Sequence, residues 1–197
     1  MGDEGAQKVV RIHNRIVREA LSANAGKEVK HTGDGIMASF ARTSDGIDAT
    51  IQMQIETAKH NETNPDLPLH LKIGLNAGEP IAEDNDLFGT VVQLSARIVD
   101  KAAADQIYVS EIVRGICAGK SYKFINLGTF EMKGFSENPT LFEVIWNPDA
   151  AEAPAPAPAA EPPAPAPAAG ANTAESPPAT APESGGDTPD APPGQPT

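Results

Sequence analysis

The sequence is poor in cysteine, in aromatic residues and in long apolar runs. Its 197 residues include one cysteine and one tryptophan, and aromatic residues make up 5% of the chain. Cys117 alone cannot form an internal disulfide, and its apolar neighbours indicate a buried side chain rather than a nucleophile. No run approaches the roughly 18 apolar residues of a membrane span, and no charged-then-apolar leader begins the chain. We therefore expect a cytoplasmic protein with no membrane span.

Basic residues are also scarce. The chain has 15 lysines and arginines against 27 acidic residues, a net charge of −12. Seven of the acidic residues and none of the basic ones lie from Asp149 onward, which leaves residues 1–148 with a net charge of about −5. A nucleic-acid groove needs a basic stripe to neutralise phosphates, so we expect no nucleic-acid partner.

The last part of the chain differs in composition from the rest. Alanine and proline alternate over residues 153–168, and serine, threonine, glycine and proline dominate from there to Thr197. Such a segment cannot bury a core, and its first half favours polyproline II. The sequence predicts a folded domain over 1–147 and a disordered acidic tail over 148–197.

Hydrophobic periodicity in the first part alternates between helical and strand-like. Helices are predicted over 4–24, from Thr43 to about residue 60, after Gly89 and after Ser110. Gly26 is expected to end the first helix as a left-handed cap. Strands are predicted over 29–32, 36–40, 69–77, 106–110, 122–125 and 141–145. This order favours an α+β or α/β sheet covered by helices.

A tight turn, Gly33-Asp34-Gly35, joins the first two predicted strands. Because glycine allows positive φ, this pattern predicts a hairpin with Asp34 at its tip. A carboxylate there is open to close approach, for example by a metal-bound phosphate. An ordinary Asp-Gly turn is the alternative, and the hairpin alone favours it.

A second stretch, residues 86–97 (DLFGTVVQLSAR), changes that balance when it is taken with Lys30 and Asp34. Together they resemble the class III nucleotide cyclases, whose catalytic domains carry a Lys-x-x-Gly-Asp hairpin and an Asp-x-aromatic-Gly-x-x-Val-Asn-x-Ala-x-Arg helix start. The resemblance runs from about residue 2 to 144. It includes two further segments, residues 71–79 (LKIGLNAGE) and 127–134 (LGTFEMKG).

The resemblance implies an α/β sandwich with a ferredoxin-like sheet and conversion of ATP to cyclic AMP and pyrophosphate. It makes Asp34 one of two aspartates that bind two Mg²⁺ or Mn²⁺ ions. Arg97 would stabilise the charge that develops on the phosphates, for which a permanently charged guanidinium is suited. Lys133 would contact the triphosphate. Gln93 stands where the family has an asparagine that orients the ribose, and it is one methylene longer.

Lys30 and Asp86 correspond to the residues that select adenine in the family. A lysine can donate to adenine N1 while a carboxylate accepts from the exocyclic amine, and guanine presents the reverse polarity at both places. The sequence therefore favours ATP over GTP. Taken one at a time, Lys30 could equally be a solvated strand residue and Asp86 a loop residue.

The family's opening strand, which ends in the other metal-binding aspartate, has no counterpart in the sequence. Asp3 matches a later surface position and is not that ligand. We expect the loss of this central strand to expose two strand edges and lower stability. One explanation is that codons upstream of Met1 encode the strand.

The leading interpretation is an adenylate cyclase domain that acts as a homodimer, or as a heterodimer with a complete cyclase domain. A catalytically impaired dimerisation or nucleotide-sensing module of the same fold is the alternative. A ferredoxin-like RNA-binding domain is disfavoured by the charge and by the lack of an aromatic pair on adjacent strands.

Overall fold

The computed structural model describes residues 3–33 and 35–147. All the elements below belong to the first of the two units into which the chain divides, Met1–Pro154. The predicted tail over 148–197 lies outside the described residues. The predicted boundary at residue 147 therefore stays a prediction.

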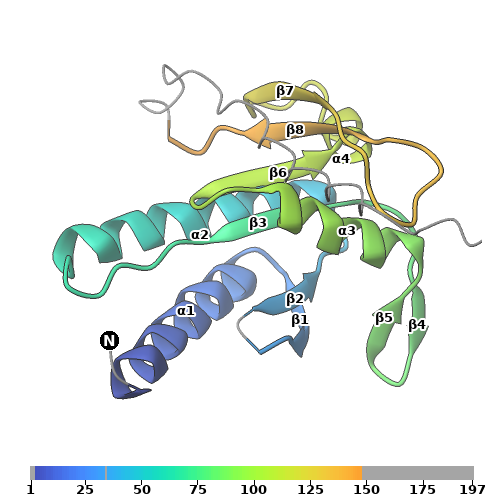
Figure 1. The fold of residues 1–197 in the computed structure, drawn as a ribbon. Helices are drawn as coiled ribbons and strands as arrows, with labels where there is room; N and C mark the ends of the chain where they lie inside the picture. The colour runs from blue at the N-terminus through green and yellow to red at the C-terminus, as the bar shows by residue number, and fades with distance from the viewer. Residues whose placement is uncertain (1–2, 34, 148–197) are drawn as a thin grey trace, which may run out of the picture. The chain divides into compact units, whose positions relative to one another are not determined.

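Helices are interspersed with single strands and runs of two or three strands along the described chain (Figure 1). Their order is α1 (Asp3–Ala23), β1 (Lys27–His31), β2 (Ile36–Ser39), α2 (Thr43–Thr63), β3 (Lys72–Leu75), β4 (Ile81–Glu83), β5 (Asp86–Phe88), α3 (Thr90–Lys101), β6 (Gln106–Ser110), α4 (Glu111–Ile116), β7 (Phe124–Thr129) and β8 (Thr140–Val144).

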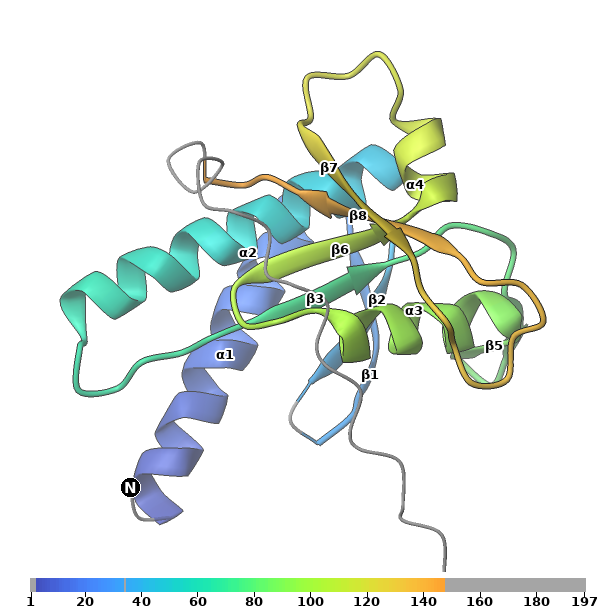
Figure 2. The same ribbon diagram turned by 45° about the horizontal axis from the view of Figure 1, so that its top comes forward.

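The main sheet has four strands in the order β3-β6-β8-β7. Strand β3 is parallel to β6, and the other two pairs are antiparallel. Side chains of β6 alternate between two cores: Ile107 and Val109 pack with Ile47 of α2, whereas Tyr108 packs with Ile98 of α3. Helices α2 and α3 therefore cover opposite faces of the sheet (Figure 2). This arrangement confirms the predicted α+β fold with a helix-covered sheet.

A third core joins the first two helices. Ile16, Val17 and Leu21 on one side of α1 pack against Ala49 and Met53 of α2, and all five are buried. Burying a side chain of this size stabilises a fold by about 1.5–3 kcal/mol. The amphipathic helix that the sequence predicts is thus confirmed, and its apolar stripe holds α1 on α2.

Gly26 is not the left-handed cap that the sequence predicts. The residue with positive φ after α1 is Ala25, at 54°. Gly26 is needed for space instead, because a Cβ there would lie 2.4 Å from the Phe40 ring and 2.8 Å from Leu21 Cδ2. The chain leaves α1 so close to the Phe40 ring, which follows β2, that a residue with a Cβ would clash.

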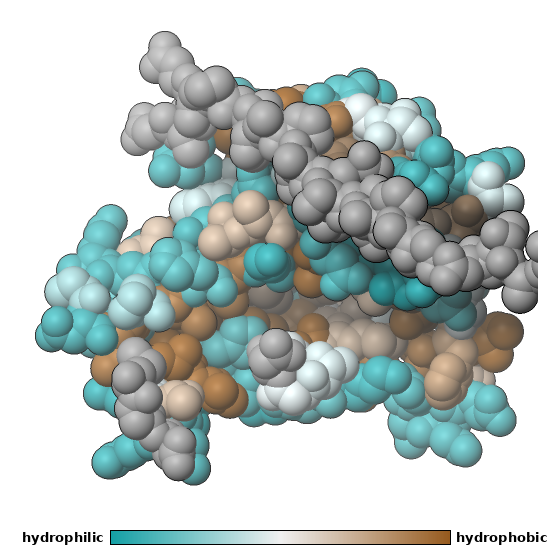
Figure 3. Space-filling model, in the orientation of Figure 1, coloured by the Kyte–Doolittle hydropathy of each residue, from teal (hydrophilic) through white to brown (hydrophobic). Residues whose placement is uncertain are grey.

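Two of the unpaired strand edges in the described chain belong to β2 and β3. Strand β2 pairs only with β1, and β3 pairs only with β6 among the described strands. Ile36 and Ala38 of β2 and Ile73 of β3 nevertheless pack against the same α1–α2 core. In Figure 3 the surface between β3 and the β1–β2 hairpin is hollowed and partly brown, that is, apolar. Strands β2 and β3 thus each present an edge that no described strand pairs.

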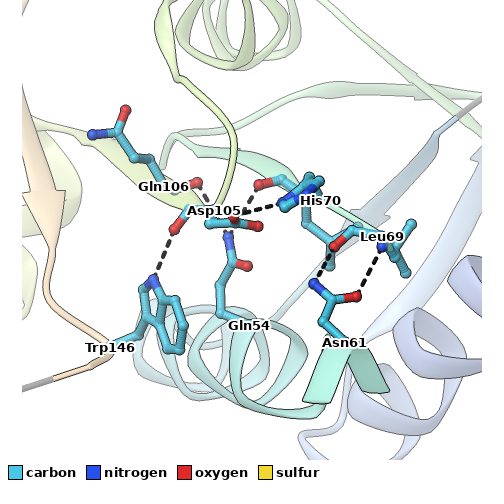
Figure 4. A network of polar contacts seen from close by, with 8 residues as sticks. Gln54, Asn61, Leu69, His70, Asp105, Gln106 and Trp146 are labelled. Carbon is cyan, nitrogen blue, oxygen red and sulfur yellow. Dashed lines mark hydrogen bonds and ion pairs between the residues drawn. The ribbon is translucent and has the colours of Figure 1, made fainter. Parts of the chain in front are cut away.

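Side chains of α2, and Trp146, form hydrogen bonds with the backbone just before β3 and β6 begin (Figure 4). The Asn61 side chain accepts from the Leu69 N–H at 2.8 Å and donates to the Leu69 carbonyl at 2.7 Å. Gln54 Nε2 donates to the Leu71 carbonyl at 3.2 Å. Trp146 Nε1 donates to the carbonyl of Asp105, 2.8 Å away. These bonds fix where β3 and β6 begin.

Some strand limits differ from the prediction. Strand β7 begins at Phe124 rather than residue 122, because the Tyr122 hydroxyl donates to the Asp48 carboxylate at 2.7 Å and holds that residue on α2. Strand β3 covers Lys72–Leu75 instead of 69–77, since Leu69 is bonded to Asn61. Within the described part of the chain, every helix is too short or too polar to cross a membrane.

Candidate functional site

A β-bulge sets the direction of Lys30. In the β1–β2 hairpin Glu28 lies opposite Ala38 and Lys30 lies opposite Met37, so Val29 is an extra residue on β1. An inserted residue bends the strand and redirects the side chains that follow it. Lys30 projects from this irregular point.

Asp86, which taken alone could be a loop residue, is the first residue of β5 in the β4–β5 hairpin. Asp84 and Asn85, with φ of 49° and 65°, form the turn between β4 and β5. Two consecutive residues with positive φ match the twist of tight hairpins, and asparagine and aspartate tolerate that conformation. The Asp-Asn pair was the signal for this hairpin, but strands of three residues are too short to show alternation.

The structure brings Lys30 and Asp86 together. Lys30 Nζ donates to Asp86 Oδ2 at 2.6 Å, and the Leu87 N–H donates to Asp86 Oδ1 at 2.8 Å. The hydrogen bond from Lys30, and after it the one from Leu87, holds the pKa of Asp86 below its usual value. Asp86 is therefore a carboxylate with both oxygens engaged at neutral pH.

The aromatic ring of Phe88 lies beside the Lys30–Asp86 pair. The Phe88 ring centroid lies 5.6 Å from Lys30 Nζ, within the range of cation–π attraction. Phe88 is 45% exposed, which is high for a residue of its size. The sequence signal for this residue is its place two positions after Asp86, on the same side of a strand.

Helix α3 carries Gln93 and Arg97 on one exposed side. They are four residues apart, so their side chains are neighbours on the helix surface. Arg97 Nη1 donates to Asp100 Oδ2 at 3.3 Å, also on α3. No hydrogen bond or ion pair joins either residue to Lys30 or Asp86 among the described residues.

Lys133 lies in the connection between β7 and β8 and is exposed. Its neighbour Met132 is buried against Ile98, which is next to Arg97. One apolar core therefore anchors both backbone segments that carry Arg97 and Lys133. The side chains themselves are not joined by any bond within residues 3–33 and 35–147.

The predicted metal ligand Asp34 lies outside the described residues. Elsewhere in the described chain, no group of three or more histidine, cysteine, aspartate or glutamate side chains is placed to hold a metal ion. The described residues therefore do not form a complete metal site by themselves.

Comparison with known proteins identifies the family. The model of the adenylate and guanylate cyclase catalytic domain matches residues 4–145. The putative adenylate cyclase 3 of Rhizobium meliloti is 28% identical over 142 residues, which cover 71% of this chain and 24% of that protein. An adenylate cyclase of Streptomyces coelicolor is 29% identical over 110 residues, covering 55% of this chain and 27% of that protein. The chain thus corresponds to about a quarter of each relative.

Solved structures of cyclases are also similar to this chain. The adenylate/guanylate cyclase/hydrolase from Silicibacter pomeroyi superposes with a TM-score of 0.64 at 27% identity, covering 73% of this chain and 85% of the other. The adenylyl cyclase CyaB from P. aeruginosa has the same fold, with a TM-score of 0.63 at 17% identity over 74% and 84% of the two chains. The chain belongs to the adenylate and guanylate cyclase catalytic domain family, the class III nucleotide cyclases.

Proposed function

We propose that this domain takes part in the synthesis of cyclic AMP and pyrophosphate from ATP. The observation that carries the proposal is the 2.6 Å contact between Lys30 Nζ and Asp86 Oδ2, from two separate hairpins. A donor beside an acceptor matches the edge of adenine, where N1 accepts and the neighbouring amine donates. On guanine N1–H donates and O6 accepts, so each contact would be lost and leave a polar group unpaired.

Three further side chains are proposed to act on the ribose and the phosphates. Arg97 would stabilise the negative charge that develops as pyrophosphate leaves. Its present partner Asp100 is exposed and only three residues away, and such pairs contribute about 0–1 kcal/mol. The guanidinium can therefore turn to a phosphate at little cost. Gln93 would bond the ribose, and Lys133 the triphosphate.

Class III cyclases generally use divalent metal, and Mg²⁺ or Mn²⁺ is proposed here. A bound metal supplies activation of the attacking 3′ oxygen and neutralises phosphate charge. Asp34 is the proposed ligand from this chain. The described residues hold no complete set of ligands for the metal.

The site is proposed to form between two cyclase domains. Members of the family bind a nucleotide and commonly dimerise, and here the proposed residues fall into two groups. Asp34 would serve the metal, whereas Lys30, Asp86 and Arg97 would serve the base and the transition state. A homodimer, or a heterodimer with a complete cyclase domain, would bring the two groups together.

A catalytically impaired dimerisation or nucleotide-sensing module is the second candidate. Gln93 favours it, because it stands where the family has an asparagine and its extra methylene can misplace a catalytic hydrogen bond. It predicts that the purified protein binds ATP but converts none with either Mg²⁺ or Mn²⁺. Conversion by the protein alone would exclude it.

The deciding experiment is complementation. The chain is mixed with a complete cyclase domain whose own transition-state arginine has been replaced by alanine, and cyclic AMP is measured with Mn²⁺ and ATP. We expect synthesis in the mixture and none from the mutant domain alone. Arg97→Ala should abolish it, whereas Arg15→Ala, on the exposed side of α1, should not. If the two proteins associate and no cyclic AMP forms, the proposed catalytic role is wrong.

A further inference from the structure

The surroundings of the Lys30 ammonium assign a role to Phe88. A lysine ammonium has three N–H donors. One is bonded to Asp86 Oδ2 at 2.6 Å, and the Phe88 ring lies 5.6 Å from the same nitrogen. We propose that Phe88 is a positioning residue for nucleotide selection: its ring and Asp86 together orient Lys30 so that one N–H points to the base. This inference rests on the proposed function.

Packing does not explain the position of Phe88. Among the described residues, the three buried cores and the apolar side chains packed against them do not include it. Its partner across the β4–β5 hairpin, Ile81, is 67% exposed and gives it little cover. The ring does lie against the Lys30 ammonium.

The ring is needed because lysine is flexible. Its four-carbon stem lets the ammonium take many positions around a single carboxylate. The bulge at Val29 sets where the stem leaves β1, and Asp86 fixes one N–H direction. The ring attracts the ammonium from a second direction. The ammonium is tetrahedral, so once two of its N–H directions are restrained the direction of the third N–H is fixed as well.

This geometry defines the chemistry of the ligand. Lys30 offers one donor, which suits one ring nitrogen with a lone pair. Both Asp86 oxygens already accept a hydrogen bond, from Lys30 and from the Leu87 N–H, and each keeps a second acceptor position. The pair therefore selects a base with an unprotonated ring nitrogen next to an amino group. Loosening Lys30 would weaken that selection more than it weakens nucleotide binding in general.

The test uses Phe88→Leu, with Phe88→Tyr as the conservative variant. Ile81→Ala is the matched control, because it removes apolar surface from the same hairpin without touching Lys30. The first measurement is the NMR shift of the Lys30 ε-CH₂ protons in lysine-labelled protein, assigned with Lys30→Arg. The second is the dissociation constants of ATP and GTP.

In the wild type we expect the ε-CH₂ signal to be shifted upfield by the ring. The shift should be lost in Phe88→Leu and kept in Phe88→Tyr and Ile81→Ala. The preference for ATP over GTP should fall by about two- to five-fold in Phe88→Leu only, the size of an exposed cation–π contact.

The outcomes separate the two proposals. An ε-CH₂ signal that does not respond to Phe88→Leu overturns the positioning role, whatever the protein binds. A wild type that prefers ATP and a Phe88→Leu variant that keeps the whole preference overturn it too, and leave the proposed function standing. A wild type that binds neither nucleotide overturns the proposed function, and the inference with it.

Discussion

Gly74 on β3 is the position where one added methyl group would disturb the site most directly. A Cβ there would lie 2.6 Å from the backbone nitrogen of Val99, 2.7 Å from Val99 Cγ2 and 3.0 Å from the carbonyl oxygen of Ser95. Two of these atoms are backbone of α3, so no side-chain rotation relieves the clash. In Gly74→Ala, α3 must move away from the sheet, and Gln93 and Arg97 move with it.

The expected loss of stability in Gly74→Ala follows from overpacking of β3 against α3. Forcing an extra methyl into a packed contact costs about 1–3 kcal/mol, and the lower entropy of the unfolded alanine chain offsets about 0.4–1 kcal/mol of it. We expect Gly74→Ala to lower the free energy of unfolding by about 1–2 kcal/mol, measured by urea denaturation with circular dichroism.

Gly115 provides the control for this prediction. It lies in α4, and a Cβ there would meet no atom within 4 Å. Gly115→Ala should raise the free energy of unfolding by up to about 1 kcal/mol, the difference in helix propensity. If Gly74→Ala is as stable as Gly115→Ala, the close packing of β3 on α3 is wrong.

Three further predictions concern stability. Burial raises the pKa of Glu143 despite a hydrogen bond from Gln106, so the folded protein binds its proton more tightly than the unfolded chain does. The stabilisation is complete below the unfolded pKa of about 4.3 and is lost as the pH rises through the folded pKa. Glu143→Gln should therefore raise the free energy of unfolding at pH 7 and flatten its pH dependence, and equal unfolding curves for the two proteins would contradict this. In hydrogen exchange, amides of β6, which is paired on both sides, should exchange more slowly than those of β2 and β3, and equal protection would show that the two edges are covered. Deleting 149–197 should leave the melting temperature almost unchanged, because so polar and proline-rich a segment buries little. A large fall would show that the tail is docked.

Long periodic segments were predictable from the sequence. The apolar stripe of α1 and the buried strand β6 follow from the spacing of their apolar residues, and both are present. The Lys30–Asp86 contact joins residues that are 56 positions apart. Periodicity could not have paired them, and only the resemblance to a family placed them in one site.

Features made by local geometry were not predictable in this way. The bulge at Val29 depends on how β1 and β2 align, which no single strand reveals. The β4–β5 hairpin is too short for a period. Gly26 was assigned to a left-handed cap because glycine is common there, but the close approach of Phe40 is what requires it. Such positions depend on how neighbouring segments align and pack.

Analysis of the reaction products shows whether Lys30 and Asp86 select adenine. The complemented pair of domains is given equal concentrations of ATP and GTP, and both cyclic nucleotides are measured. The wild-type chain should yield mainly cyclic AMP. Lys30→Glu with Asp86→Cys presents guanine's complement and should shift the product toward cyclic GMP. The same ratio of products from the wild type and the double variant would contradict the account.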